Sequence, residues 1–294
     1  MPASSRNASP KPTLRRKTGS TGSSNALAHR CKPCQPDPDR RLYMSVIGFI
    51  GTGHIAAPMA RFLSGKGHRI NVSDRNANVA QSLVNSIGAR VLDNQAVLDA
   101  SDIVFLCLRP HVAQAVLRDL TFRADHRIVS VMAGVPLATL TTLCAPASDF
   151  TLTIPIGFLE QGGCPLPACP QPDLLASLFA PENPVIGVAT ETGLNAHFAI
   201  CTMVPGMLDL MATAASWLGD QTGDQNGAAA YTTQLIAGFL VAVQGRDDKV
   251  LARERDALAT DGTISLQMVE ALRDDGVHDV LCDALQAISA RLGD

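Results

Sequence analysis

The sequence of 294 residues predicts an α/β domain followed by an all-helical domain. Between about residues 44 and 190, short apolar runs alternate with helical segments, a pattern typical of repeated βαβ units and a parallel sheet. After residue 190 no strand pattern remains, and long stretches with helical periodicity follow. We therefore expect a tail at 1–43, an α/β domain at 44–190 and a helical domain at 191–294.

Bulk composition restricts the classes of partner. The chain is 46% apolar and 17% charged, which is typical of a packed globular protein and excludes disorder throughout. A net charge of -3 gives no electrostatic reason to expect nucleic acid, so a small molecule is the expected ligand. Polar residues or glycine interrupt the apolar runs before they reach the roughly 20 residues that cross a bilayer, so no membrane span is predicted.

The tail at 1–43 is rich in Ser, Pro, Arg and Lys and has no acidic residue before Asp37. Such a segment buries too little apolar surface to offset its ordering entropy, so we expect a disordered basic tail. Two alternatives stay open: a targeting segment of transit-peptide composition, or a true start at Met44.

The cysteines indicate a reduced environment. Most of them lie within apolar runs, and the close pair Cys31 and Cys34 has no second Cys or His pair at zinc-ligand spacing nearby. We therefore expect no metal site and a cytoplasmic location.

In the α/β domain, strands are expected where short apolar runs rich in β-branched residues end at turn residues. These runs are 45–50, 70–73, 103–108, 127–132, 150–154 and 184–188, with helices at 55–65, at 77–87 and after the strands at 103–108 and 127–132. The segment 161–173 is dense in Gly, Pro and Cys and is predicted to be a loop.

In the second domain, helices are expected over 194–218, 228–243 and 266–292. The apolar content of these helices is high for about a hundred residues standing alone. We therefore expect much of this surface to contact a second copy of the chain, in a homodimer or higher homo-oligomer.

The first strand leads directly into a glycine-rich turn that opens a helix. The turn consists of Gly51, Thr52, Gly53, His54, Ile55 and Ala56. Gly51 permits a tight turn, Gly53 allows a pyrophosphate to approach the backbone, and Ala56 allows close packing of helix on strand. The free N–H groups at the helix start favour phosphate binding. This pattern predicts a Rossmann-like dinucleotide-binding domain.

The residues that close the second strand leave the choice of dinucleotide open. Asp74 lies about 20 positions after the glycine turn, where a carboxylate binds the ribose hydroxyls of NAD. Arg75, together with Ser73 and Asn76, offers instead a site for the extra phosphate of NADP. NADP and NAD are both retained as expected cofactors.

Two further strand ends carry a family resemblance. Asn94 followed by 100–111, which ends in Leu108, Arg109 and Pro110, and then 129–135 with Ala133 and Gly134, resemble the pyrroline-5-carboxylate reductase family. Arg109 stands where that family usually has Lys. The resemblance extends over essentially all of 44–294 and implies that these residues lie near the cofactor. Both segments end at the carboxyl edge of the sheet, where open α/β folds bind ligands.

The resemblance also implies substrate contacts in the helical domain. In the stretch 260–265, Ser265 occupies the position of a family Thr whose hydroxyl contacts the imine nitrogen of the substrate. A structural alternative is that Ser265 caps a helix starting at Leu266. Thr202 is the second polar candidate, whereas His197, on an apolar helix, is interpreted as a hydrogen-bonded core histidine.

Two segments depart from the family pattern. The stretch 201–207 keeps only Pro205 of a glycine- and serine-rich family segment, with Met203 in place of a serine, and 154–158 keeps only Pro155. Apolar residues thus replace polar ones at two substrate positions. A less polar substrate, or loss of activity, would follow.

The resemblance implies an NAD(P)H-dependent reductase of a cyclic imine, such as 1-pyrroline-5-carboxylate, which is reduced to proline in proline biosynthesis. One alternative is a β-hydroxyacid dehydrogenase-like oxidoreductase. Residues 53–59 also resemble the opening segment of that group of enzymes. That chemistry needs a helix-borne Lys as proton donor, and the body of the chain has only Lys66 and Lys249, both misplaced for it. The other alternative is a catalytically silent dinucleotide-binding paralogue.

Overall fold

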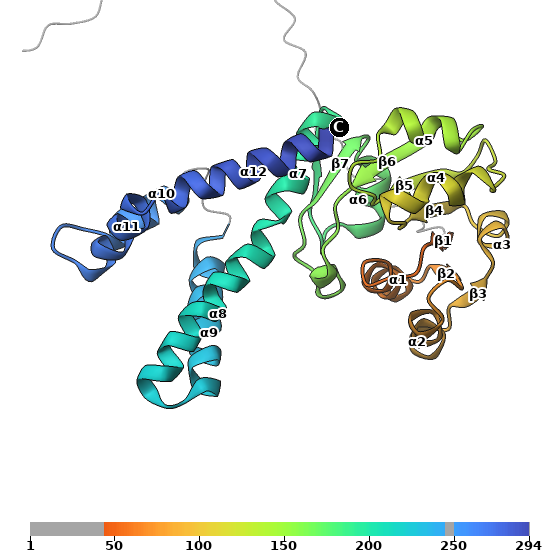
Figure 1. Cartoon of the computed structure of the whole chain (residues 1–294). Helices are drawn as coiled ribbons and strands as arrows, with labels where there is room; N and C mark the ends of the chain where they lie inside the picture. The colour runs from red at the N-terminus through yellow and green to blue at the C-terminus, as the bar shows by residue number, and fades with distance from the viewer. Residues whose placement is uncertain (1–43, 245–249, 294) are drawn as a thin grey trace, which may run out of the picture. The chain divides into compact units, whose positions relative to one another are not determined.

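The structure, a computed structural model, describes residues 44–244 and 250–293 (Figure 1). The predictions made for the tail at 1–43, including those for Cys31 and Cys34, lie outside these residues. The described residues form a Rossmann-like sheet covered by helices, followed by a helical region, so the predicted fold class is confirmed.

An eight-stranded sheet forms from the described residues, in the order β3-β2-β1-β4-β5-β6-β7-β8. All neighbouring strands are parallel except β6 and β7, which are antiparallel. The strands are β1 (Val46–Ile50), β2 (Arg69–Ser73), β3 (Arg90–Leu92), β4 (Ile103–Leu106), β5 (Arg127–Ser130), β6 (Asp149–Thr153), β7 (Leu166–Pro170) and β8 (Val185–Gly187). The strand order reverses between β1 and β4, which places a ligand crevice at their carboxyl ends.

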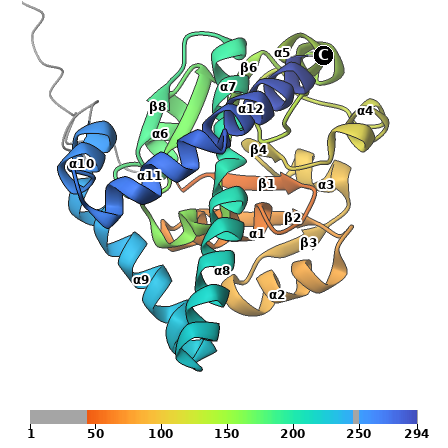
Figure 2. The same ribbon diagram turned by 60° about the vertical axis from the view of Figure 1, so that its left-hand side comes forward.

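Side-chain alternation along the central strands divides the core between the two faces of the sheet. Ile47 and Phe49 of β1 pack into one buried cluster, whereas Ile50 packs into the other. The first cluster is covered by α1 (Ala56–Gly65), α2 (Ala77–Ile87), α6 (Asp173–Phe179) and the 3-10 helix η1 (Gly157–Gln161). The second is covered by α3 (Asn94–Asp99), α4 (Pro110–Arg118) and α5 (Leu137–Leu143). Figure 2 shows this layered arrangement.

Stacked aromatic rings join the sheet to α6. The rings of Phe49 and Phe105 stack with centroids 5.0 Å apart, and Phe179 of α6 meets Phe105 edge to face at 6.3 Å. Each such ring buries enough apolar area to contribute about 2 kcal/mol or more. These contacts hold β1 and β4 in register beneath the glycine turn.

The prediction of a loop over 161–173 was wrong, because β7 lies inside this segment. Pro167 and Pro170 lack the N–H that a strand interior normally donates, and they masked the strand pattern. Leu166, Ala168 and Cys169 are nonetheless buried between β6 and β8. The short elements β3 and α3 were also not predicted.

The helical region contains α7 (Glu191–Cys201), α8 (Met203–Thr222), α9 (Gln225–Val243), α10 (Val250–Leu258), α11 (Ile264–Asp274) and α12 (Val277–Gly293). Two of the predicted helices are each divided in two. Thr202 interrupts the first, and Gly276, with φ of 71°, interrupts the second. The short α10 was not predicted.

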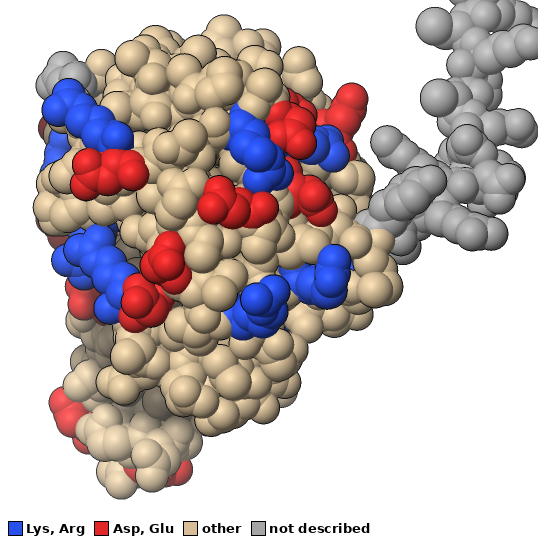
Figure 3. All heavy atoms as spheres, turned by 90° about the vertical axis from the view of Figure 1, so that its right-hand side faces the viewer, with Lys and Arg blue, Asp and Glu red and all other residues tan. Residues whose placement is uncertain are grey.

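Charges on the outer face of the α/β domain are mixed in sign. Figure 3 shows Lys and Arg interspersed with Asp and Glu on this face. Charges of opposite sign also pair directly within the α/β domain: Arg127 Nε lies 3.1 Å from Asp149 Oδ2, and Lys66 Nζ lies 2.5 Å from Glu182 Oε2. This face presents no uniformly positive surface.

The helical region exposes much of its apolar surface. Only four exposed large apolar residues of the described chain lie outside it: Met44, Val91, Phe158 and Ile186. The helices α10, α11 and α12 have no buried residue among those described. By length and composition alone, the helical stretch Glu191–Thr222 and the helix Gln225–Val243 are apolar enough to cross a membrane. Exposed apolar surface of this extent is typical of a surface that contacts another molecule.

A buried histidine makes the fold sensitive to acid. The His126 side chain is fully buried; its Nδ1 accepts a hydrogen bond from Arg123 N at 3.0 Å, and its Nε2 lies 3.1 Å from Leu98 O. Both bonds are satisfied by the neutral ring with a proton on Nε2. Burial, followed by the charge of Arg123, lowers the pKa of His126 below its ordinary 6.5.

We therefore expect stability to fall as the pH drops below about 6.5 towards the folded-state pKa of His126, because the unfolded chain then binds more protons. Thermal unfolding between pH 7.5 and 5 measures this change. The variant His126→Gln should unfold at a lower temperature at pH 7.5 but show a flatter pH dependence. An unchanged slope in the variant would contradict this assignment.

Candidate cofactor site

A cavity of about 840 Å³ opens at the carboxyl ends of β1, β2, β4 and β5. Its position matches the crevice expected where the strand order reverses. The glycine turn, the start of α2 and the segments after β4 and β5 contribute its walls. It is lined by Gly51, Thr52, Gly53, His54, Ile55, Ala56, Arg75, Asn76, Ala77, Asn78, Val79, Cys107, Leu108, Arg109, Pro110, His111, Val131, Met132 and Ala133.

The two glycines of the turn are required for different reasons. Gly51 has φ of 94°, and a Cβ there would lie 2.6 Å from the carbonyl oxygen of Cys107. A Cβ on Gly53 would have no atom within 4 Å, so the protein itself leaves this space open. Gly51 is therefore required by the fold, whereas Gly53 leaves room for a ligand.

Hydrogen bonds to the end of β2 hold the turn in place. Gly51 N donates to Ser73 Oγ at 2.9 Å, and Thr52 Oγ1 donates to Ser73 O at 2.6 Å. Both Thr52 and Ser73 are buried. The side chain of Ser73 therefore supports the turn from beneath and does not line the cavity.

The start of α1 offers free backbone donors to the cavity. The first helical bond here runs from Ala57 N to Gly53 O at 3.0 Å, and the preceding amides of His54 and Ile55 have no partner among the described residues. These N–H groups, together with the positive end of the helix dipole, suit a pyrophosphate.

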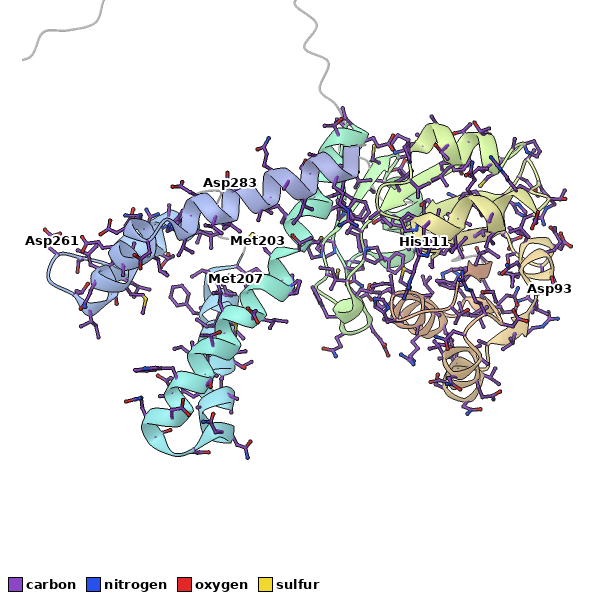
Figure 4. All side chains as sticks on the ribbon, viewed as in Figure 1. Asp93, His111, Met203, Met207, Asp261 and Asp283 are labelled. Atoms are coloured by element: carbon purple, nitrogen blue, oxygen red, sulfur yellow. The ribbon has the colours of Figure 1, made fainter. Side chains whose placement is uncertain are left out.

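The cavity wall opposite the glycine turn is formed by the residues that come after β4 and β5 in the chain. Arg109 precedes α4, which begins at Pro110, where the missing N–H of proline costs no hydrogen bond. His111, in the first turn of the same helix, also lies on the cavity wall (Figure 4). Burial raises the pKa of the Cys107 thiol, which favours its protonated form.

The structure brings most of the predicted cofactor residues together. Those on the cavity wall are Gly51, Thr52, Gly53, His54, Ile55, Ala56, Arg75, Leu108, Arg109, Pro110 and Ala133. Asp74, Asn94 and Gly134 do not line it. Asn76, which the sequence offered together with Arg75 for the phosphate of NADP, also lines the cavity, and the lining residues not predicted are Ala77, Asn78, Val79, Cys107, His111, Val131 and Met132. Each of these residues adjoins a predicted residue in sequence or continues the same helix turn. Because open α/β sheets bind ligands at the carboxyl ends of their strands, their positions after β2, β4 and β5 were the signal that could have found them.

The two predicted catalytic residues do not reach this cavity within one chain. Thr202 is exposed and donates from Oγ1 to Ala199 O at 2.6 Å. Ser265 is exposed in the first turn of α11. The alternative that Ser265 caps a helix was wrong: the cap is Thr263, whose Oγ1 accepts from Leu266 N at 3.2 Å.

The structure places the other helical-region candidates as follows. His197 Nδ1 lies 2.8 Å from Gly193 O, one turn earlier in α7, so the residue is hydrogen-bonded as interpreted, but it is half-buried and not part of the core. Met203 and Met207 lie one turn apart on α8 (Figure 4). The chain stays nearly helical through Thr202, whose N donates to Ala199 O and whose O accepts from Gly206 N.

The end of α12 approaches the nucleotide-binding domain. Asn195 Nδ2 of α7 donates to Leu292 O at 3.1 Å. A Cβ on Gly134 would lie 3.9 Å from Leu292 Cδ2, so α12 ends beside the turn that follows β5. The helical region is thereby anchored next to the carboxyl edge of the sheet.

Comparison with known proteins agrees with this geometry. Residues 46–134 match the family model described as NADP oxidoreductase coenzyme F420-dependent. The chain is 27% identical over 268 residues to pyrroline-5-carboxylate reductase 3 of Danio rerio, covering 83% of this chain and 89% of the relative.

Solved structures share the fold. A 1-pyrroline-5-carboxylate reductase from Streptococcus pyogenes superposes with a TM-score of 0.75 at 17% identity, covering 85% of this chain and 98% of the other. A Plasmodium falciparum pyrroline carboxylate reductase with NADP bound superposes with a TM-score of 0.73 at 14% identity, covering 85% and 97%.

The fold, the glycine turn and the cavity define an NAD(P)-dependent oxidoreductase. The relatives that the chain matches are pyrroline-5-carboxylate reductases, the family that the sequence resembles. The chain is similar to pyrroline-5-carboxylate reductases over most of its length, at 27% identity to relatives matched over 83% of the chain.

Proposed function

We propose that this protein reduces a cyclic imine, of the type of 1-pyrroline-5-carboxylate, to the corresponding amine with NADPH or NADH, as in the formation of proline. The glycine turn over an open cavity at the strand-order reversal carries this proposal. The match to pyrroline-5-carboxylate reductase 3 of Danio rerio over 83% of the chain supports the choice of substrate class.

The residues present suit this chemistry. A bound reduced nicotinamide supplies the hydride that the imine carbon accepts. The amides at the start of α1 hold the pyrophosphate, and the segments after β4 and β5 orient the rest of the dinucleotide. A cyclic imine takes its proton readily from water, so the site needs a hydroxyl such as that of Ser265 or Thr202 to orient the nitrogen, and it needs no strong acid.

A second copy of the chain is proposed to complete the site. Ser265 and Thr202 are exposed and lie off the cavity wall of their own chain. The helices that carry them have exposed apolar faces that require a cover. In a homodimer or higher homo-oligomer, the partner's helical region covers these faces and brings a hydroxyl to the imine.

A soluble, cytoplasmic enzyme fits this proposal better than a membrane protein does. The apolar helices α8 and α9 include polar or charged residues such as Asp209 and Gln234 well inside their lengths. Such residues are costly in hydrocarbon. A protein interface accommodates them at its polar rim.

The test is oxidation of NADPH and NADH at 340 nm with a panel of imines. The panel contains 1-pyrroline-5-carboxylate, the carboxylate-free 1-pyrroline and the six-membered analogues of both. Turnover of at least one imine is expected, and the apolar Met203 and Ile156 predict less preference for the carboxylate-bearing compounds. Cofactor binding without turnover on any imine would favour a silent paralogue. Turnover only with β-hydroxyacids would favour the dehydrogenase alternative.

A further inference from the structure

Residues 131–136, the β5–α5 turn, connect the cavity wall to the helical region. Val131, Met132 and Ala133 line the cavity, and Gly134 has φ of 70°. In an open α/β sheet of this kind, the adenosine half of a dinucleotide lies over the end of β2, and the other half lies across the crevice. The nicotinamide of a bound cofactor is therefore expected against the β5–α5 turn.

The helix α5, which follows this turn, has no side-chain cap of its own. Its first amide, Leu137 N, donates instead to Oε1 of Glu191 in the first turn of α7, at 2.9 Å. The start of α7 does not need this carboxylate, because Thr190 caps α7 by accepting from Gly193 N at 3.0 Å. A carboxylate is a strong acceptor for a backbone amide, so this bond fixes the end of the β5–α5 turn.

Apolar packing joins the same two elements. Leu194 of α7 is fully buried and belongs to the same core cluster as Met132 and Val135 of the β5–α5 turn. Met132 also lines the cavity. Because a packed core resists displacement of one part against another, the position of α7 determines the position of this part of the cavity wall.

The last turn of α12 contacts the β5–α5 turn as well. A Cβ on Gly134 would lie 3.9 Å from Leu292 Cδ2, which is van der Waals distance, and Asn195 Nδ2 of α7 donates to Leu292 O at 3.1 Å. Figure 1 shows the end of α12 beside α7. Glu191 and Asn195 lie four residues apart and so share one face of α7. One bonds to the start of α5, and the other holds Leu292 against the turn.

We propose that Glu191, Asn195 and Leu292 are positioning residues for hydride transfer, because they fix the β5–α5 turn on which the nicotinamide rests. None of the three lines the cavity, so they act through the turn and do not touch the cofactor. A small misplacement of a reacting group lowers the rate of a reaction strongly. The inference rests on the proposed function for its rate measurement, whereas its fluorescence measurement requires only that the cavity binds NADPH.

Two substitutions of Glu191 in the full chain test this inference. Glu191→Ala removes the acceptor of Leu137 N and is expected to lower kcat with the imine about 10- to 100-fold. The dissociation constant of NADPH should change by less than about threefold, because the amides at the start of α1 still bind the pyrophosphate. Glu191→Gln keeps an acceptor oxygen and should retain kcat within about threefold of the wild type.

The fluorescence lifetime of bound NADPH provides a readout that does not depend on the imine. A nicotinamide ring that is held less firmly loses its excitation faster. The lifetime is therefore expected to be shorter in Glu191→Ala than in the wild type and in Glu191→Gln. Asn195→Ala and Leu292→Ala should shorten it too, and each should lower kcat by about three- to tenfold.

Asp102 provides the matched control, because it also accepts from a backbone amide far away in the sequence. Its Oδ2 lies 3.0 Å from Val46 N, at the amino end of β1 and thus at the sheet edge remote from the cavity. Asp102→Ala should lower the unfolding temperature by a few degrees, as Glu191→Ala does, and leave kcat and the NADPH lifetime unchanged.

Unchanged kcat and lifetime in Glu191→Ala, or equal losses in Asp102→Ala, would overturn the inference. A loss of kcat in Glu191→Gln as large as that in Glu191→Ala would also contradict it, because the acceptor oxygen would then be irrelevant. If the wild type binds NADPH but reduces no imine, the proposed reaction fails, and the lifetimes alone decide whether these residues position the nicotinamide.

Discussion

Replacing Gly53 with valine is expected to weaken binding of both NADPH and NADH by at least about a hundredfold while leaving the fold intact. The protein places no atom within 4 Å of a Cβ at this position, and Gly53 lies on the cavity wall. A valine side chain would therefore occupy the space through which the pyrophosphate meets the backbone amides. Fluorescence titration measures the loss of binding, and thermal unfolding without cofactor checks the fold.

The neighbouring glycine of the same turn provides the matched control. Gly51→Ala introduces a Cβ 2.6 Å from the carbonyl oxygen of Cys107 at a residue with φ of 94°. We expect it to destabilise the protein by about 2–4 kcal/mol, because both backbone strain and steric overlap must be accommodated. Normal nucleotide affinity in Gly53→Val would show that the pyrophosphate does not bind at this turn.

The sequence predicted the central part of the sheet well because local and tertiary signals agree there. The segment from β1 to α2 combines apolar runs, a glycine turn and a helix whose predicted bounds, 77–87, match those of α2. The strand β7 was missed because Pro167 and Pro170 oppose strand formation locally. Its neighbours β6 and β8 stabilise it through pairing that no short stretch of sequence reveals.

Side-chain direction at the cofactor site was harder to predict than residue identity. The spacing from the glycine turn to Asp74 predicts a ribose-binding carboxylate, but spacing does not state which side chain turns inward. The hydrogen bond from Gly51 N to Ser73 Oγ decides this, and it depends on how β1 and β2 pair. Likewise, Thr263 and Ser265 are both suitable helix caps by sequence, and only the backbone at the start of α11 distinguishes them.

In a single chain, the residues assigned to substrate binding lie away from the cofactor cavity. The sequence resemblance assigns a role to Ser265, and α11 exposes that residue away from its own cavity wall. The exposed apolar residues of α8 and α9 link this feature to assembly. If a second copy covers these helices, then disruption of that contact should impair both association and turnover.

If the proposed homo-oligomer forms through α9, Leu240→Glu is expected to convert it largely to monomer. Leu240 lies on α9 and is 51% exposed in the single chain. An unpaired carboxylate at an apolar interface costs several kcal/mol, so we expect association to weaken at least about a hundredfold. Analytical ultracentrifugation over a range of protein concentrations measures the shift, and imine turnover should fall with the oligomer fraction.

The control for Leu240→Glu is Ile186→Glu, because Ile186 is similarly exposed, at 45%, but lies on β8 of the α/β domain. It should leave the oligomer intact. A monomeric wild type would contradict the assembly argument. If the wild type sediments with membranes and is extracted only by detergent, then the exposed faces of α8 and α9 contact lipid. If the oligomer dissociates in Leu240→Glu while NADPH affinity is retained, then the nucleotide site is built by one chain, and the substrate site depends on two.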